Sequence, residues 1–461
     1  MKNIFKILAI AGLSFCASLS LSATELPVRY KSGSLNMTPR KNSDNWITTV
    51  DVRYGQTETR DGFNTNSERT SALDIFGQTN LVRLGFGLEG LTNVVPNTYT
   101  QWTLGYDATR PPPPPPPPPA GPLDTNSTNL IKTTGRVSAS ELTLNIEQNL
   151  FSGFFGQCYI PFRQMTVDNI NYEVIGNQVM PGHVGTVTNF VSTLLTPIMR
   201  EQGMEYPLSS YKKQAVSELV LGLGWQGFNN QGFGVIDDAT GRIFVGAIIP
   251  GAGKQDTSYM TGFPLGYDGF WGVHTRLELE VGLEKVLALG AASSINIFFI
   301  DTRNARVMSD VEKKQTGLLS LAQARVDVDQ GAVWDVSAFA KLHKVFYGLT
   351  AQAGYSFSRQ EKTCLTIKDD NYLKTAALRY QGMVPPQFLS REDVINSDQR
   401  LQSWERQMLH LAIGYDFRLH NPAPAIAPYL GFEYGYPIDG RRVMVGKYLG
   451  GTASVQVKMP F

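Results

Sequence analysis

Polar and apolar residues alternate along many short stretches of this chain. The clearest stretch is the last one, where single Ser, Gln, Lys and Pro residues separate Ala453, Val455, Val457, Met459 and Phe461. Side chains of a β-strand point to opposite faces with a period of two, so this stretch has one apolar face. A strand of this kind suits a barrel that has lipid outside and water inside.

The same alternation recurs upstream and keeps the charges on one face. Between Thr275 and Leu283, for example, Arg276, Glu278 and Glu280 share one face and the leucines share the other. We therefore expect an all-β fold, a transmembrane antiparallel up-and-down β-barrel of about 14 strands, with 12 to 16 as the range. The expected strands span residues 46–54, 80–90, 98–106, 136–148, 153–166, 216–228, 242–251, 270–283, 286–300, 331–342, 345–359, 404–419, 426–438 and 450–461. A soluble β-sandwich also alternates, and strand by strand that alternative stays open.

The connections between these strands alternate in length. If the C-terminus lies in the periplasm, the shorter connections all fall on the periplasmic side, at 91–97, 149–152, 229–241, 284–285, 343–344 and 420–425. Those predicted to face outward are mostly long, at 55–79, 107–135, 167–215, 252–269, 301–330, 360–403 and 439–449. Short periplasmic turns and long extracellular loops are typical of bacterial outer-membrane barrels.

The N-terminal residues predict export. Lys2 and Lys6 precede an apolar stretch from Ile7 to Leu21 that ends at Ala23, the pattern of a secretory signal peptide over residues 1–23. Residues 24–45 are expected to be a periplasmic or lumenal segment, and residues 46–461 the barrel. The proline run within 107–135 cannot pair in a sheet, so we expect a proline-rich outer loop there. Its function is open between a docking peptide and a low-complexity spacer.

The composition excludes several classes of function. The formal net charge of +1 gives no reason to expect nucleic acid as a partner. Removal of the signal would leave two of the three cysteines, too few for a disulfide framework. We expect no metal and no cofactor.

The signal peptide, the amphipathic strands and the terminal Phe461 together resemble bacterial outer-membrane porins. The resemblance implies Sec export to the outer membrane and contact with outer-membrane lipid. It also implies that the barrel assembly machinery recognises the last strand, with Phe461, Met459, Val457 and Val455 as the signal. A homo-oligomer is an open alternative, because subunit contact and lipid contact both use an apolar face.

The polar faces supply candidate pore-lining residues of both signs. Opposed acidic and basic patches would orient polar solutes in a water-filled pore, whereas paired charges would rigidify a filled or plugged barrel. The candidates are Asp51, Arg53, Arg83, Glu141, Arg276, Glu278, Glu280, Asp335, Lys341, Arg406, Arg418, Glu433 and Lys458.

We expect no enzymatic activity from the sequence. The five histidines are scattered, and none is paired in sequence with a nucleophile. The expected function is a porin-like channel for passive diffusion of small hydrophilic solutes. The alternative is a structural or adhesive barrel that displays long outer loops without a conducting pore.

Overall fold

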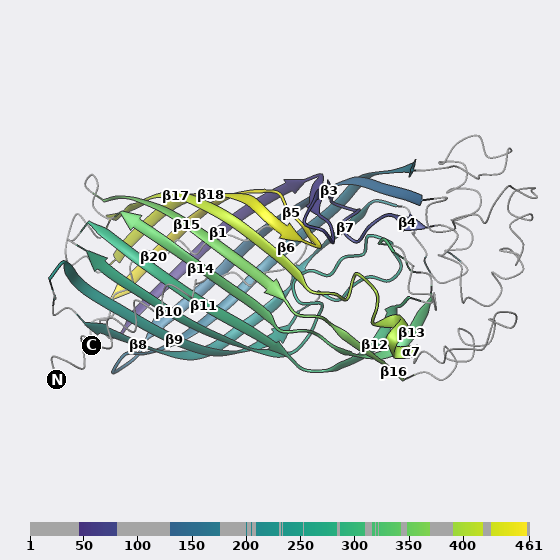
Figure 1. The fold of residues 1–461 in the computed structure, drawn as a ribbon. Coiled ribbons are helices and arrows are strands. Elements are labelled where there is room, and N and C mark those ends of the chain that lie inside the picture. Colours follow the sequence, from purple (N-terminus) through teal and green to yellow (C-terminus); the bar gives the residue numbers. More distant parts are fainter. Residues whose placement is uncertain are drawn as a thin grey trace, which may run out of the picture.

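The chain forms a closed antiparallel β-barrel (Figure 1). The computed structural model describes residues 46–80, 130–175, 200, 204, 209–229, 232, 234–251, 253–283, 286–308, 316–318, 320, 322–342, 348–368, 391–417 and 426–458. The strands of the ring, in chain order, are β1 (Ile47–Thr59), β5 (Leu130–Asn149), β6 (Phe154–Ile175), β8 (Glu218–Asn229), β9 (Ile236–Pro250), β10 (Gly272–Leu283), β11 (Leu287–Phe298), β14 (Val333–Leu342), β15 (Leu349–Gln360), β17 (Trp404–Asp416), β18 (Ile426–Arg441) and β20 (Lys447–Lys458).

The ring contains twelve of the described strands, fewer than the expected 14 but within the expected range. The difference arises because β1 pairs directly with β5, from Thr48 opposite Gln148 to Thr59 opposite Val137. Such pairing leaves no place in the wall for the strands predicted at 80–90 and 98–106. Apart from Asn80, those two predicted segments lie outside the described residues.

Each ring strand has one buried and one exposed face. In β1 the buried positions alternate with exposed ones from Arg53 to Thr59, and β18 alternates in the same way. The exposed face carries large apolar residues, among them Leu223, Leu411 and Phe432 at 60–69% exposure. The other face points to the barrel interior and carries charged side chains, Asp51 and Arg53 among them, together with aromatic rings such as Tyr429 and Tyr448. An apolar outside around a polar inside is the construction of a transmembrane barrel, which the alternation predicted.

The two ends of the barrel differ. At one end the ring strands are joined by connections such as Asn149 to Phe154 and Leu283 to Leu287. At the other end, short extra elements occupy the connections. These elements are β2 (Asp61–Phe63), β3 (Arg69–Ser71), β4 (Thr79–Asn80), β7 (Tyr211–Val216), β12 (Asp301–Arg306), β13 (Gln323–Asp329), β16 (Cys364–Ile367), α7 (Arg391–Ile395) and β19 (Val443–Met444).

Several of these extra elements build on the ring. The strand β7 pairs with residues 162–167 of β6. Residues 154–159 of the same strand pair with β8. Two small sheets, β12-β13-β16 and β19-β2-β3, form beyond the ring. Figure 1 shows β12, β13, β16 and α7 grouped at the right-hand end of the barrel.

Buried apolar side chains from these connections form one cluster, which we call the loop cap. Its members come from connections throughout the chain and pack on ring-strand residues such as Val167 and Phe298. The residues of the loop cap are Ala72, Leu73, Ile75, Phe76, Met204, Tyr211, Met260, Phe263, Leu265, Tyr267, Phe270, Val307, Leu318, Ala322, Leu365, Ile395 and Met444. Burial of apolar surface drives folding in water, and the loop cap shares one apolar cluster with ring-strand residues such as Tyr159 and Phe244.

Candidate functional site: the barrel lumen

The predicted pore-lining residues that the structure describes face the interior. Buried there are Asp51, Arg53, Glu141, Arg276, Asp335, Lys341, Arg406 and Glu433, and Glu278 and Glu280 are partly buried. Arg83, Arg418 and the side chain of Lys458 lie outside the described residues. So do Met459 and Phe461 of the predicted assembly signal, whereas Val455 is on the exposed outer face. The roles of these residues stay predictions.

A buried ionic triad joins three strands near the loop cap. Arg163 of β6 donates from Nε to Glu141 Oε2 of β5, and from Nη1 to Glu218 Oε1 of β8 at 2.5 Å. All three side chains are at most 4% exposed. Thr143 also donates its hydroxyl to Glu141 Oε1 at 2.9 Å. Two carboxylates around one guanidinium compensate charges that would be costly to bury alone.

The segment 253–271 lies over this triad. Gly266 has a φ of +84°, and a Cβ atom there would come within 3 Å of both Glu218 Oε2 and Arg163 Nη1. Next to it, the Tyr267 hydroxyl accepts a hydrogen bond from Asn296 Nδ2 of β11 at 3.1 Å. Glycine is needed here for the backbone conformation and for the close approach. The segment therefore reaches from the β6 and β8 wall to β11 at the mouth of the lumen.

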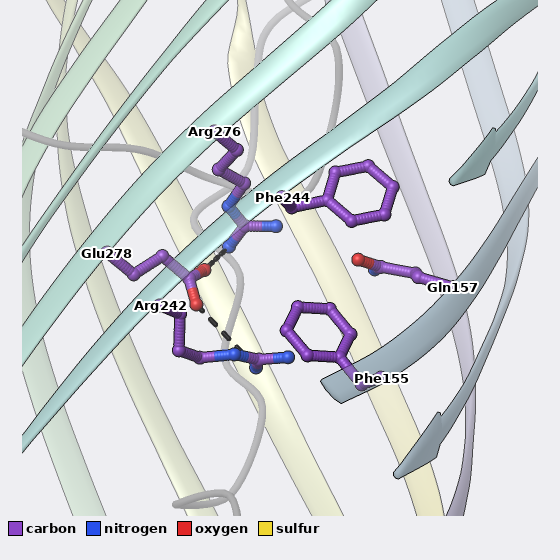
Figure 2. Close-up of a pocket in the computed structure, with 6 residues that line it drawn as sticks. All are labelled: Phe155, Gln157, Arg242, Phe244, Arg276 and Glu278. Carbon is purple, nitrogen blue, oxygen red and sulfur yellow. Dashed lines mark hydrogen bonds and ion pairs between the residues drawn. The ribbon is translucent and has the colours of Figure 1, made fainter. Parts of the chain in front are cut away.

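A second charged cluster lies beside a small hollow in the lumen (Figure 2). Glu278 of β10 bridges Arg276 of the same strand and Arg242 of β9, whose Nη1 is 3.6 Å from Glu278 Oε2. Arg242 also donates to Glu147 Oε2 of β5 at 2.7 Å. Figure 2 shows the two guanidinium groups on either side of the Glu278 carboxylate. Arginines and carboxylates thus alternate around this part of the wall.

Aromatic side chains form another side of this lumenal hollow. The rings of Phe155 and Phe244 stack with centroids 6.1 Å apart, and the Arg242 guanidinium lies 4.2 Å from the Phe155 centroid. Gln157 completes the lining and donates to Asn145 Oδ1 at 2.8 Å. The hollow has a volume of about 10 Å³, room for about one water molecule. It offers N–H donors, a carboxylate and ring faces in one place.

Some buried N–H groups in these two clusters have no hydrogen-bond acceptor within the described part of the chain. They are Nη2 of Arg163, Nε of Arg242 and Nε of Arg276, whereas Nη1 of Arg242 has only the ion pair of 3.6 Å with Glu278. An unsatisfied buried donor costs roughly 1–3 kcal/mol, and more when it is charged. These groups therefore favour an interior that water enters.

On the opposite wall, a hydrogen-bonded set joins β15, β17 and β18. The Ser356 hydroxyl lies 2.8 Å from His410 Nε2, and His410 Nδ1 lies 3.0 Å from Glu433 Oε1. All three residues are buried and face the interior. Close by on the same face, Ser358 donates its hydroxyl to Asp335 Oδ1 at 2.8 Å.

Solved structures similar to this chain include outer-membrane channels. An outer membrane channel from Pseudomonas putida F1 has 9% sequence identity and a TM-score of 0.43, covering 92% of this chain and 99% of that one. A FadL homologue from Pseudomonas aeruginosa has 11% identity and a TM-score of 0.30, with 90% of each chain covered. The NanC porin has 10% identity and a TM-score of 0.26, covering 70% of this chain and 94% of its own. No family model and no curated protein matches the sequence.

Sequence reasoning did not single out several lumenal residues that the structure brings together. Arg163 and Glu218 lie within or beside predicted strands, and the period of two could have placed them inward. The pairing of Ser356 with His410, which are 54 residues apart, has no signal in the sequence. In the described ranges, no group of three or more His, Cys, Asp or Glu residues is placed to hold a metal ion. Nor is any described helix long and apolar enough to cross a membrane.

Proposed function

We propose that the chain is a bacterial outer-membrane channel through which small hydrophilic solutes diffuse passively. The observation that carries this proposal is the set of acceptor-free guanidinium N–H groups inside a barrel with an apolar outer surface. A hydrated interior satisfies those groups at little cost, and a hydrated lumen that crosses a membrane is a path for polar solutes. The mixed charges of the wall would orient such solutes without a net preference for one sign.

The two ends of the barrel suggest its orientation. Extra elements and the loop cap occupy one end, and strand ends such as Asn149, Phe154, Leu283 and Leu287 lie at the other. Bacterial barrels carry their short turns in the periplasm. We therefore place the loop cap outside the cell, with the segment 253–271 narrowing the outer mouth.

The groups around the hollow of Figure 2 suggest how the wall contacts a passing solute. The hollow itself has room for about one water molecule, so the solute would meet these groups from the lumen and would not enter the hollow. Arg242 and Arg276 can donate to oxygen atoms of the solute, and Glu278 can accept from its hydroxyl groups. The Phe155 and Phe244 rings offer an apolar face to its carbon skeleton. A solute with both hydroxyl groups and an apolar edge would find partners for each.

Planar-bilayer recordings of the purified full-length protein test the proposal. We expect stepwise openings of low conductance, because the segment 253–271 narrows the mouth. A variant in which a short Gly-Ser linker replaces residues 256–266 should conduct at least about twofold more. Its control is Val235→Ala, which shortens a side chain that is 62% exposed in a turn at the other end of the barrel.

A second function is favoured by the loop cap itself. Apolar side chains from six connections pack together in one cluster. Loops around an open pore do not need to pack in this way. A barrel that displays this cap as a structural or adhesive surface would fold normally and conduct nothing. If both the folded wild type and the linker variant are silent, the channel is refuted in favour of the display function.

A further inference from the structure

Three adjacent strands bring a hydroxyl, an imidazole and a carboxylate into line inside the barrel. Ser356 of β15, His410 of β17 and Glu433 of β18 form the two hydrogen bonds of 2.8 and 3.0 Å described above. The carboxylate accepts the proton on Nδ1 of the ring, which leaves Nε2 as the acceptor for the Ser356 hydroxyl. This tautomer is the one in which an imidazole can deprotonate a serine.

Serine hydrolases of several unrelated folds share this arrangement, in which a hydroxyl bonds to an imidazole and the imidazole bonds to a carboxylate. In such sites the carboxylate holds the imidazole in position, and the imidazole activates the hydroxyl as a nucleophile. The neighbouring Ser358 gives an internal comparison, because its hydroxyl donates directly to Asp335 at 2.8 Å. A serine that only links two strands needs no imidazole beside it. Ser356 is hydrogen-bonded to the His410 imidazole, which the Glu433 carboxylate orients.

A second observation points to the same place. Ser337 of β14 is directly opposite Ser356 in register, and side chains of such pairs have Cβ atoms about 4.5–5.5 Å apart. Ser337 is fully buried, and its hydroxyl has no hydrogen-bond partner in the described structure. The backbone of β15 is paired with β14 on one side and β17 on the other. A free side-chain hydroxyl is therefore a suitable donor to an oxyanion that forms at Ser356.

We propose that Ser356 is a nucleophile that cleaves small carboxylic esters entering the lumen, with His410 as general base and Glu433 as its positioning residue. The Ser356 oxygen bonds to the ester carbonyl carbon while His410 Nε2 accepts the hydroxyl proton. The bond from that carbon to the alcohol oxygen then breaks, and the alcohol leaves with this proton. Water next attacks the acyl-serine, giving the acid and restoring the hydroxyl.

A fluorophosphonate probe tests this proposal on the full-length protein in detergent micelles. Ser356 would bond to phosphorus and fluoride would leave, while His410 takes the proton. We expect a single adduct on the peptide that contains Ser356, mapped by mass spectrometry on the wild type. We also expect hydrolysis of p-nitrophenyl acetate above the rate of buffer, and loss of that activity in the labelled protein.

Variants separate catalysis from structure. Ser356→Ala and His410→Gln should lower the labelling rate by about 100-fold or more, and Glu433→Gln should do so with an unchanged unfolding midpoint. Ser358→Ala is the matched control on the same strand face and should label at the wild-type rate. An unlabelled wild type, or an adduct on another residue, overturns the proposal. If the wild type and a folded Glu433→Gln variant label at equal rates, the proposed positioning role of Glu433 is wrong.

Discussion

At the scale of single residues, the sequence predicted which side chains face inward but not their partners. Alternation alone placed Arg276 and Glu278 on one face of a strand, where they do form an ion pair. It could not show that Arg242 binds Glu147, because these residues are 95 positions apart and meet only when β6 and β8 have paired between β5 and β9. The candidate site is therefore predictable as a face of each strand and unpredictable as a set of contacts.

Replacement of Arg163 tests the buried ionic triad. In Arg163→Ala, the carboxylates of Glu141 and Glu218 would lose the cation between them and remain buried, which typically destabilises by about 3–5 kcal/mol. Urea unfolding in detergent would measure the loss. Arg136→Ala is the control, because Arg136 pairs with Asp168 at a more exposed site and little change is expected. Equal stability of both variants would show that water already screens the triad.

At the scale of elements, periodicity predicted most ring strands and overestimated their number. The segments 80–90 and 98–106 alternate like strands, yet β1 pairs with β5 without them. A period of two reports how a strand would present its faces, whereas membership of the ring depends on pairing between distant segments. The small strands of the loop cap, such as β12 and β16, were not predicted, because three to six residues carry too little of any period.

The connection between β3 and β4 gives the loop cap a pH dependence. Burial raises the pKa of Asp74 from 3.8 to about 6, despite a hydrogen bond from Thr70 and the nearby charge of Lys132. The folded cap thus keeps a proton that the unfolded chain releases near pH 4. The free energy of unfolding should fall as the pH rises from about 4 to 6, by at most about 3 kcal/mol and by less where solvent screens the carboxylate.

Asp74→Asn should remove this dependence, because an amide carries no charge to bury. Urea midpoints at pH 4.5 and pH 8 provide the measurement. The variant and the wild type should differ little at pH 4.5, and the variant should be the more stable at pH 8. A larger stability gap at pH 4.5 than at pH 8 would contradict the raised pKa.

At the scale of the whole molecule, the apolar belt determines where the barrel is stable. Leu411 of β17 is 60% exposed on the outer face, and arginine there should cost about 2–4 kcal/mol near the bilayer midplane. Phe299 follows the end of β11 and is similarly exposed, at 57%; Phe299→Arg should cost about 0–1 kcal/mol at the interface. Urea unfolding in phospholipid vesicles compares the two variants. Equal small costs would mean that the outer face does not meet hydrocarbon.

The pairing of β1 with β20 has a consequence for how the protein folds. Ile47 lies opposite Lys458, so the first described strand of the chain is held by the last one. Until β20 arrives, β1 has an open edge and the ring is an unclosed sheet whose backbone groups lack partners. Pairings over so long a stretch of chain form slowly. Closure should therefore be the late, rate-limiting step of folding, and a chain that loses β20 should remain an aggregation-prone open sheet.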